Sequence, residues 1–73
     1  MADYYPLITK AVARTQNAED RQRLYERGRK VLRAELAAIR PPLRQSVITN
    51  ELLTFEEAIS KVEAEIRAAS GSE

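Results

Sequence analysis

The stretch VITNELLTFEEAISKVEAEIRAA, from Val47 to Ala69, decides the fold of this chain. Its apolar residues recur in alternating steps of four and three, the spacing of a stripe along one side of an α-helix. The stripe, termed the seam below, consists of Ile48, Leu52, Phe55, Ile59, Val62, Ile66 and Ala69. At 1.5 Å per residue it is about 33 Å long. The rest of the chain must therefore be arranged so that this stripe is covered.

Two more helices are expected before the seam. The first covers residues 4–14, where the side chain of Asp3 can accept the free backbone N–H groups of the first turn. The second covers residues 18–40, with Asn17 as its N-cap. The chain shows no internal repeat and no strand-like alternation, so the sequence predicts an all-α domain.

Two consecutive prolines, Pro41 and Pro42, end the second helix, because proline lacks a backbone N–H and disfavours the helical conformation of the residue before it. The third helix is expected over residues 46–69, with Ser46 as its cap and Gly71 as its stop signal. Long helices joined by so short a turn fold back on one another. We therefore expect three helices, of which the last two form an antiparallel hairpin.

The charges of the two hairpin helices are opposite. Residues 18–44 hold eight arginines or lysines and four acidic residues, whereas residues 45–73 hold two basic and six acidic residues. The net charge of +1 for the whole chain hides this asymmetry. We expect the basic helix to pair with the acidic one.

Length and composition narrow the class of protein. Seventy-three residues make a single domain, 1–73, and we expect 1–2 and 70–73 to lie outside its ordered part. No apolar run approaches the roughly 18 residues of a membrane span, and the beginning of the chain lacks the pattern of a signal peptide. We expect a cytoplasmic protein with no membrane partner.

Catalysis is not expected. The chain has no cysteine and no histidine, and no glycine-rich loop that could hold a phosphate. Two glutamates flank each side of the seam, and such carboxylates could serve acid–base or metal chemistry; they are Glu51, Glu56, Glu63 and Glu65. Without a histidine partner, they are better explained as pairing residues beside a helix–helix contact. We predict no catalytic residue, no cofactor and no metal.

The apolar face of the second helix contains two unusual residues, Gly28 and Glu35. The glycine either allows another element to approach closely, a helix or one of the two N-terminal tyrosines, or is simply tolerated. The glutamate is either a buried charge that fixes the register or the choice of partner, or a side chain whose stem packs while its head reaches water or a nearby lysine or arginine. The remaining face consists of Leu24, Tyr25, Val31, Leu32, Leu36 and Ile39.

Nucleic-acid binding is the alternative function that the charge pattern raises. Arg29, Arg33 and Arg40 share one flank of the second helix and could contact phosphates. No exposed aromatic residue lies between the basic residues, and the domain is nearly neutral. Two intrahelical pairs in the favourable order would neutralise part of this surface: Glu19–Arg23 and Glu26–Lys30.

Self-association is the expectation that follows from the length of the seam. The first helix, near 11 residues, is expected to cover only about half of the open side of the hairpin. That would leave Val47, Leu53 and Leu43 exposed, and a symmetric dimer would bury the same patch twice. The alternative is a monomeric three-helix bundle with a modestly exposed leucine. We predict a homodimer.

The sequence also resembles a small helical domain family of uncharacterised alphaproteobacterial proteins. The resemblance covers nearly the whole chain and rests on the segments DYYPLITKAVA (3–13), RLYERGRKVLRAEL (23–36), PPL (41–43) and ITNELLTFEEAISKVEAE (48–65). The chain departs from the family pattern at Gly28, where the family tends to have alanine, and at Ala18, where it tends to have proline. The resemblance implies no activity or cofactor. It implies an interaction or dimerisation module, because the family segment often begins longer proteins.

Overall fold

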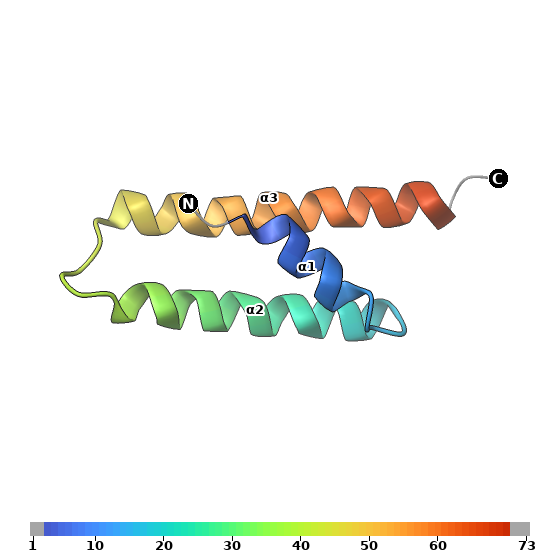
Figure 1. The fold of residues 1–73 in the computed structure, drawn as a ribbon, viewed down its shortest axis with the longest axis horizontal. Coiled ribbons are helices and arrows are strands. Elements are labelled where there is room, and N and C mark those ends of the chain that lie inside the picture. The colour runs from blue at the N-terminus through green and yellow to red at the C-terminus, as the bar shows by residue number, and fades with distance from the viewer. Residues whose placement is uncertain (1–2, 71–73) are drawn as a thin grey trace.

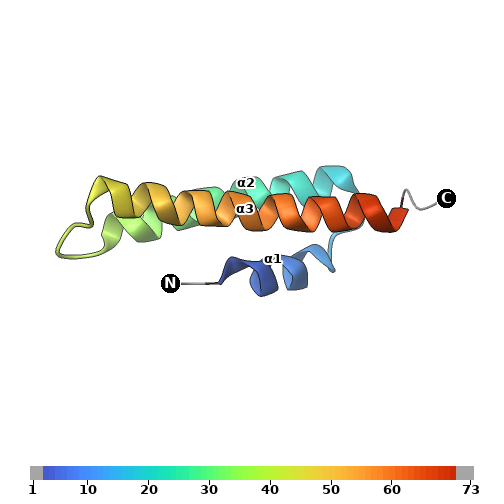
Figure 2. The ribbon, with the colours of Figure 1, turned by 90° about the horizontal axis from the view of Figure 1, so that it is seen from above.

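A computed structural model describes residues 3–70, and it contains three α-helices: α1 (Tyr4–Val12), α2 (Ala18–Ala38) and α3 (Gln45–Ser70) (Figure 1). The helices α2 and α3 run antiparallel, and α1 lies on one side of this hairpin (Figure 2). The domain measures 50 × 18 × 15 Å. The all-α, three-helix prediction is confirmed. None of the helices within residues 3–70 combines the length and the apolar character that a membrane span needs.

The N-caps predicted for the first two helices are present. The side chain of Asp3 accepts a hydrogen bond from the backbone N–H of Tyr5 at 3.3 Å, and that of Asn17 accepts one from the N–H of Asp20 at 2.9 Å. These bonds satisfy backbone donors that have no partner inside a helix. The local sequence therefore fixes where α1 and α2 begin.

The prediction placed the ends of α1 and α2 two residues too late. After Val12 the backbone forms tight bonds between residues three apart, such as Thr15 N–H to Val12 O at 2.9 Å, which close the last turn of α1. Ile39, after the end of α2, is already extended, with φ −69° and ψ 135°. It leads into a cis peptide bond between Arg40 and Pro41.

The start of α3 differs from the prediction by one residue. The backbone carbonyl of Arg44 accepts the N–H groups of Val47 at 3.0 Å and of Ile48 at 3.1 Å. Arg44 thus holds the cap position, and Ser46 lies in the first turn; its assignment as the cap was wrong. The stop signal expected at Gly71 lies outside the described residues, as do the predictions for 1–2 and 71–73. Ser70, which was expected outside the ordered part, is the last residue of α3.

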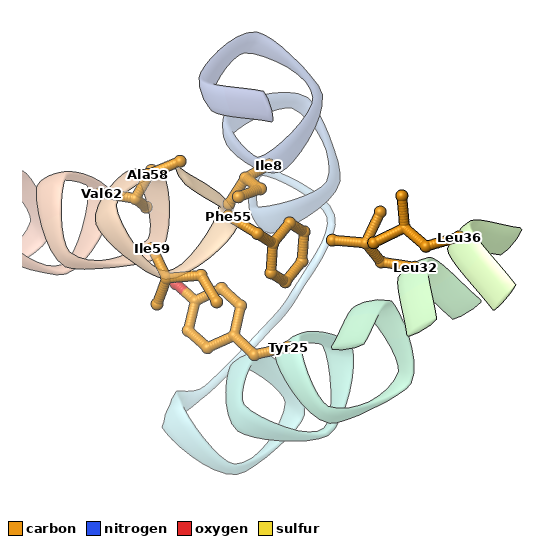
Figure 3. Packing of buried hydrophobic residues seen from close by; sticks show 8 residues of the cluster. All are labelled: Ile8, Tyr25, Leu32, Leu36, Phe55, Ala58, Ile59 and Val62. Atoms are coloured by element: carbon orange, nitrogen blue, oxygen red, sulfur yellow. The ribbon is translucent and has the colours of Figure 1, made fainter. Parts of the chain in front are cut away.

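Buried side chains from all three helices meet in one core, in which Phe55 lies among residues of α1 and α2 (Figure 3). The eight members are Ile8, Tyr25, Leu32, Leu36, Phe55, Ala58, Ile59 and Val62. Six of the seven seam residues belong to this core or pack against it, and only Ala69, at its end, is exposed. Helices α1 and α2 therefore cover the seam together.

The apolar face of α2 is covered only in part. Val31 is 49% exposed, and Leu7, on the facing side of α1, is 64% exposed. The cause is the position of α1, which packs mainly on α3 and only lightly on α2. Two members of the predicted apolar face of α2 therefore lie outside the core: Val31, and Ile39, which is exposed beyond the end of the helix.

Candidate protein-interaction site

Two arginines of α2 are clamped by the glutamates on one flank of α3. Arg21 donates to Glu63 through Nε at 2.6 Å and Nη2 at 3.3 Å, and Arg29 donates to Glu56 through Nε at 2.5 Å and Nη2 at 3.0 Å. Both pairs are bidentate, the geometry in which a guanidinium and a carboxylate bind most strongly. The predicted pairing of the basic helix with the acidic one is confirmed at these two contacts.

The glutamates on the other flank of α3 hold α1. The hydroxyl of Tyr4 donates to Glu51 at 2.6 Å, and that of Tyr5 donates to Glu65 at 2.5 Å. The ammonium group of Lys61 also lies 4.5 Å from the centre of the Tyr5 ring, within the range of a cation–π contact. All four flanking glutamates therefore act as pairing residues, as predicted from their positions beside the seam.

Hydrogen bonding and burial shift the pKa of three of the side chains between the helices, Tyr4, Tyr25 and Glu63. Hydrogen bonds from Arg21 and Tyr25 hold the pKa of Glu63 below its usual range. Burial, followed by the hydrogen bond to Glu63, raises the pKa of Tyr25 to about 12, and burial, followed by the bond to Glu51, raises the pKa of Tyr4 to about 12. A group that keeps one charge state over the whole neutral range is a poor proton carrier. Within residues 3–70 no cluster of three metal-ligating side chains occurs.

Gly28 lies directly below an aromatic ring of α3. A Cβ atom at this position would lie 2.8 Å from Cζ of Phe55. The same ring packs edge-on against Tyr4, with a centroid distance of 5.4 Å and an interplanar angle of 81°. The close-approach interpretation of the glycine is therefore correct, with Phe55 as the neighbour. Glu35, by contrast, is exposed, so it is not a buried charge.

An apolar groove runs between α1 and α2. Its centre is a hollow of about 160 Å³ lined by Leu7, Ile8, Ala11, Leu24, Tyr25, Gly28 and Phe55. A hollow of about 320 Å³ continues it toward Val31 and Glu35, and one of about 440 Å³ continues it toward Arg14 and Arg23. The three hollows share lining residues, so they form one surface feature, termed the α1–α2 groove below.

The residues predicted to mediate self-association do not form one patch. Leu53 is 53% exposed and Val47 is also exposed, but Leu43 is half-buried and packs against the core. Val47 and Leu53 are six residues apart on α3, which separates them by about 120° around the helix. Among the described residues, the large apolar side chain with the largest exposed fraction is instead Leu7, at 64%, which lines a hollow.

The arginines predicted to contact nucleic acid are only partly available. Arg29 is bound to Glu56 and also to Glu26, at 3.1 Å. Arg40 donates through Nη1 to the carbonyl oxygens of Ala37 at 3.0 Å and Ile39 at 3.1 Å. Arg33 is exposed. The intrahelical ion pairs found in α2 are Asp20–Arg23 and Glu26–Arg29, and not the two pairs that the spacing suggested.

The groove itself was not predicted, although a signal for it exists in the sequence. Leu24 and Val31 are seven residues apart, and Arg27 lies between them on the same side of α2. On α1, Leu7 is followed at the helical spacing by Lys10 and by Ala11. An apolar stripe that is bordered by basic residues on two neighbouring helices is the pattern that could have indicated it.

In comparisons with known proteins, no family model, no curated protein and no solved structure matches this chain. The family resemblance noted from the sequence stays a prediction. The functional interpretation therefore rests on the geometry of the site.

Proposed function

We propose that this domain is a non-enzymatic protein–protein interaction module that receives an α-helix in the α1–α2 groove. The observation that carries the proposal is the open apolar floor of the groove, bordered by Leu7 and Val31. Exposed apolar grooves between helices are used by other proteins to bind the apolar face of an amphipathic helix. The cytoplasmic location expected from the sequence stays a prediction.

The size of the groove supports this proposal. The central hollow, about 160 Å³, is comparable with an engineered cavity of about 150 Å³ that accommodates a benzene molecule. Its polar neighbour, the hydroxyl of Tyr25, is already bonded to Glu63. From Arg23 to Glu35 the groove follows α2 for about 18 Å. An aliphatic side chain of a three-turn helix therefore fits the centre of the floor.

The test uses a synthetic helical peptide with leucines at the i, i+3 and i+7 positions and only uncharged polar residues elsewhere. Titrated into ¹⁵N-labelled protein, it should shift the amide signals of Leu7, Leu24 and Val31. Leu7→Ser should weaken binding about tenfold, because burial of a leucine contributes about 1.5–3 kcal/mol. The matched control is Leu53→Ser, which removes a leucine of similar exposure from α3. Shifts centred on Leu53, or no binding, would contradict the proposal.

Self-association is a second candidate, favoured by the exposure of Leu53 on the outer side of α3. Sedimentation equilibrium from about 10 µM to 1 mM measures it directly. A dimer should dissociate on dilution, and Leu53→Glu should weaken it without unfolding the chain. A single species of 8.3 kDa at every concentration would eliminate the homodimer and leave the groove proposal unchanged.

Nucleic-acid binding is less well supported, because Arg29 and Arg40 already have partners within the chain. We expect no micromolar binding of duplex or single-stranded DNA or RNA at low salt. Tight binding with a steep salt dependence, lost on Arg33→Glu, would reverse this assignment.

A further inference from the structure

We infer that the α1–α2 groove selects an acidic amphipathic helix from another protein. This inference rests on the proposed function, because it names the chemistry of the ligand for the same groove. The apolar floor binds the leucines of the ligand, and the charges around one end of the groove favour a ligand of opposite charge.

The end of the groove formed by the hollow of about 440 Å³ is basic. Arg14, Arg23 and Arg27 line it, together with one acidic residue, Asp20. Lys10, in the last turn of α1, follows Leu7 by three residues and therefore lies on the same side of that helix.

Most of this positive charge is not used inside the domain. Asp20 pairs with Arg23 at 3.1 Å, with the Asp20 side chain 40% and the Arg23 side chain 72% exposed, so it offsets at most one of the positive charges. Among the described residues, no salt bridge involves Arg14 or Arg27. These two guanidinium groups are available to carboxylates of a bound helix.

The other end of the groove carries the opposite charge. Glu35 lines the hollow that extends toward Val31 and is exposed. A bound helix therefore gains most when its carboxylates lie over Arg14 and Arg27 and when its other end is neutral or basic. The charge pattern specifies both the chemistry and the direction of the ligand.

A second copy of this chain is a poorer occupant. A symmetric dimer whose two-fold axis passes through the groove would set one groove against another and leave both apolar floors unfilled. A convex helix fills the groove directly, with its leucines at the centre and its carboxylates over the basic end.

The experiment compares three labelled peptides that share the leucine spacing of the uncharged probe. One carries glutamates at the flanking positions of one end, one carries lysines there, and one carries glutamines. By fluorescence anisotropy at low salt, the glutamate peptide should bind about tenfold more tightly than the lysine peptide. Added salt at about 0.2 M should reduce this difference, because it screens exposed charges.

Arg27→Gln should remove much of the preference for the glutamate peptide, whereas Arg33→Gln, which removes an exposed arginine from another side of α2, should not. Leu7→Ser should weaken the binding of all three peptides. Equal affinities of the three peptides would overturn the inference and leave the helix-binding function standing, and failure of all three to bind would overturn both. Binding of the glutamate peptide that ignores Leu7→Ser would also overturn it, since the contact would then be electrostatic alone.

Discussion

The hydroxyl of Tyr25 in α2 donates a hydrogen bond to the carboxylate of Glu63 in α3 at 2.6 Å. Tyr25 is the most deeply buried large side chain of the described residues, with 2% of its surface exposed. Arg21 binds the same carboxylate. A hydrogen bond from a core tyrosine and an ion pair thus share one carboxylate. The carboxylate of Glu63 therefore connects the apolar core, through Tyr25, to the ion pairing between the basic and the acidic helix.

Acid should weaken the fold through these carboxylates. The pKa of Glu63, lowered mainly by the hydrogen bond from Arg21, and that of Glu56, lowered mainly by the bond from Arg29, are below the value in the unfolded chain. Their contribution is present above about pH 4.3, the ordinary glutamate value, and is lost as the pH falls through the lowered folded-state values. The free energy of unfolding in urea should therefore decrease between about pH 5 and pH 3.

The variant that checks this is Glu63→Gln, which should cost about 1–2 kcal/mol at pH 7 and progressively less as the pH falls. Its matched control is Glu57→Gln, which removes an exposed carboxylate of α3 that takes part in no salt bridge of the described residues. An equal loss of stability for both variants at every pH would contradict the assignment.

Alkali should act through the tyrosines. The pKa of Tyr25 and that of Tyr4 are raised to about 12, chiefly by burial, so the folded state binds these protons more tightly than the unfolded state. The stability they contribute is complete below about pH 10 and is lost as the pH rises toward 12. Phenolate absorbance should therefore develop at higher pH in the folded chain than in urea. Coincident titration curves in the two states would show that the hydroxyls are not held as described.

Replacing Gly28 should test the contact with Phe55. Gly28→Ala improves helix propensity by about 1 kcal/mol, but the added methyl group must displace a ring that also packs on Tyr4, and overpacking costs about 1–3 kcal/mol. We expect a net loss of about 1 kcal/mol. In a Phe55→Leu background the same substitution should become stabilising. Urea unfolding of the four chains measures both effects, and stabilisation in both backgrounds would argue against the contact.

Truncations along α3 should distinguish its buried side from its outer side. Ile59→Ala removes methyl groups from a side chain that is 6% exposed and should cost about 3 kcal/mol. Leu53→Ala changes an exposed residue of the same helix and should alter stability by less than about 0.5 kcal/mol. Far-UV circular dichroism during urea unfolding provides the comparison. A large loss for Leu53→Ala would mean that this leucine is buried in solution, as in a dimer.

The predictable part of this fold came from local signals. The apolar spacing from Ile48 to Ile66 defined the buried side of α3, and the short polar side chains of Asp3 and Asn17 defined where two helices begin. Both signals act within a few residues of the positions they determine. They identify helices and their apolar sides without information about the rest of the molecule.

The candidate site could not be predicted in the same way, because it depends on where α1 lies. That position is set by hydrogen bonds from Tyr4 to Glu51 and from Tyr5 to Glu65, which join residues 47 and 60 positions apart in the chain. A short helix with apolar residues on a broad face could have covered Val31 instead. The sequence predicts that α1 packs on the hairpin, but it does not specify which side of α2 is left open.

The two flanks of α3 bind different helices, and this has a consequence for how the position of α1 can change. One row of glutamates holds α2 and the other holds α1, so substitutions in the second row act on α1 while the hairpin keeps its own ion pairs. Changes at Tyr5 and Glu65 would therefore alter the distance between the groove walls while both ion pairs of the hairpin stay in place.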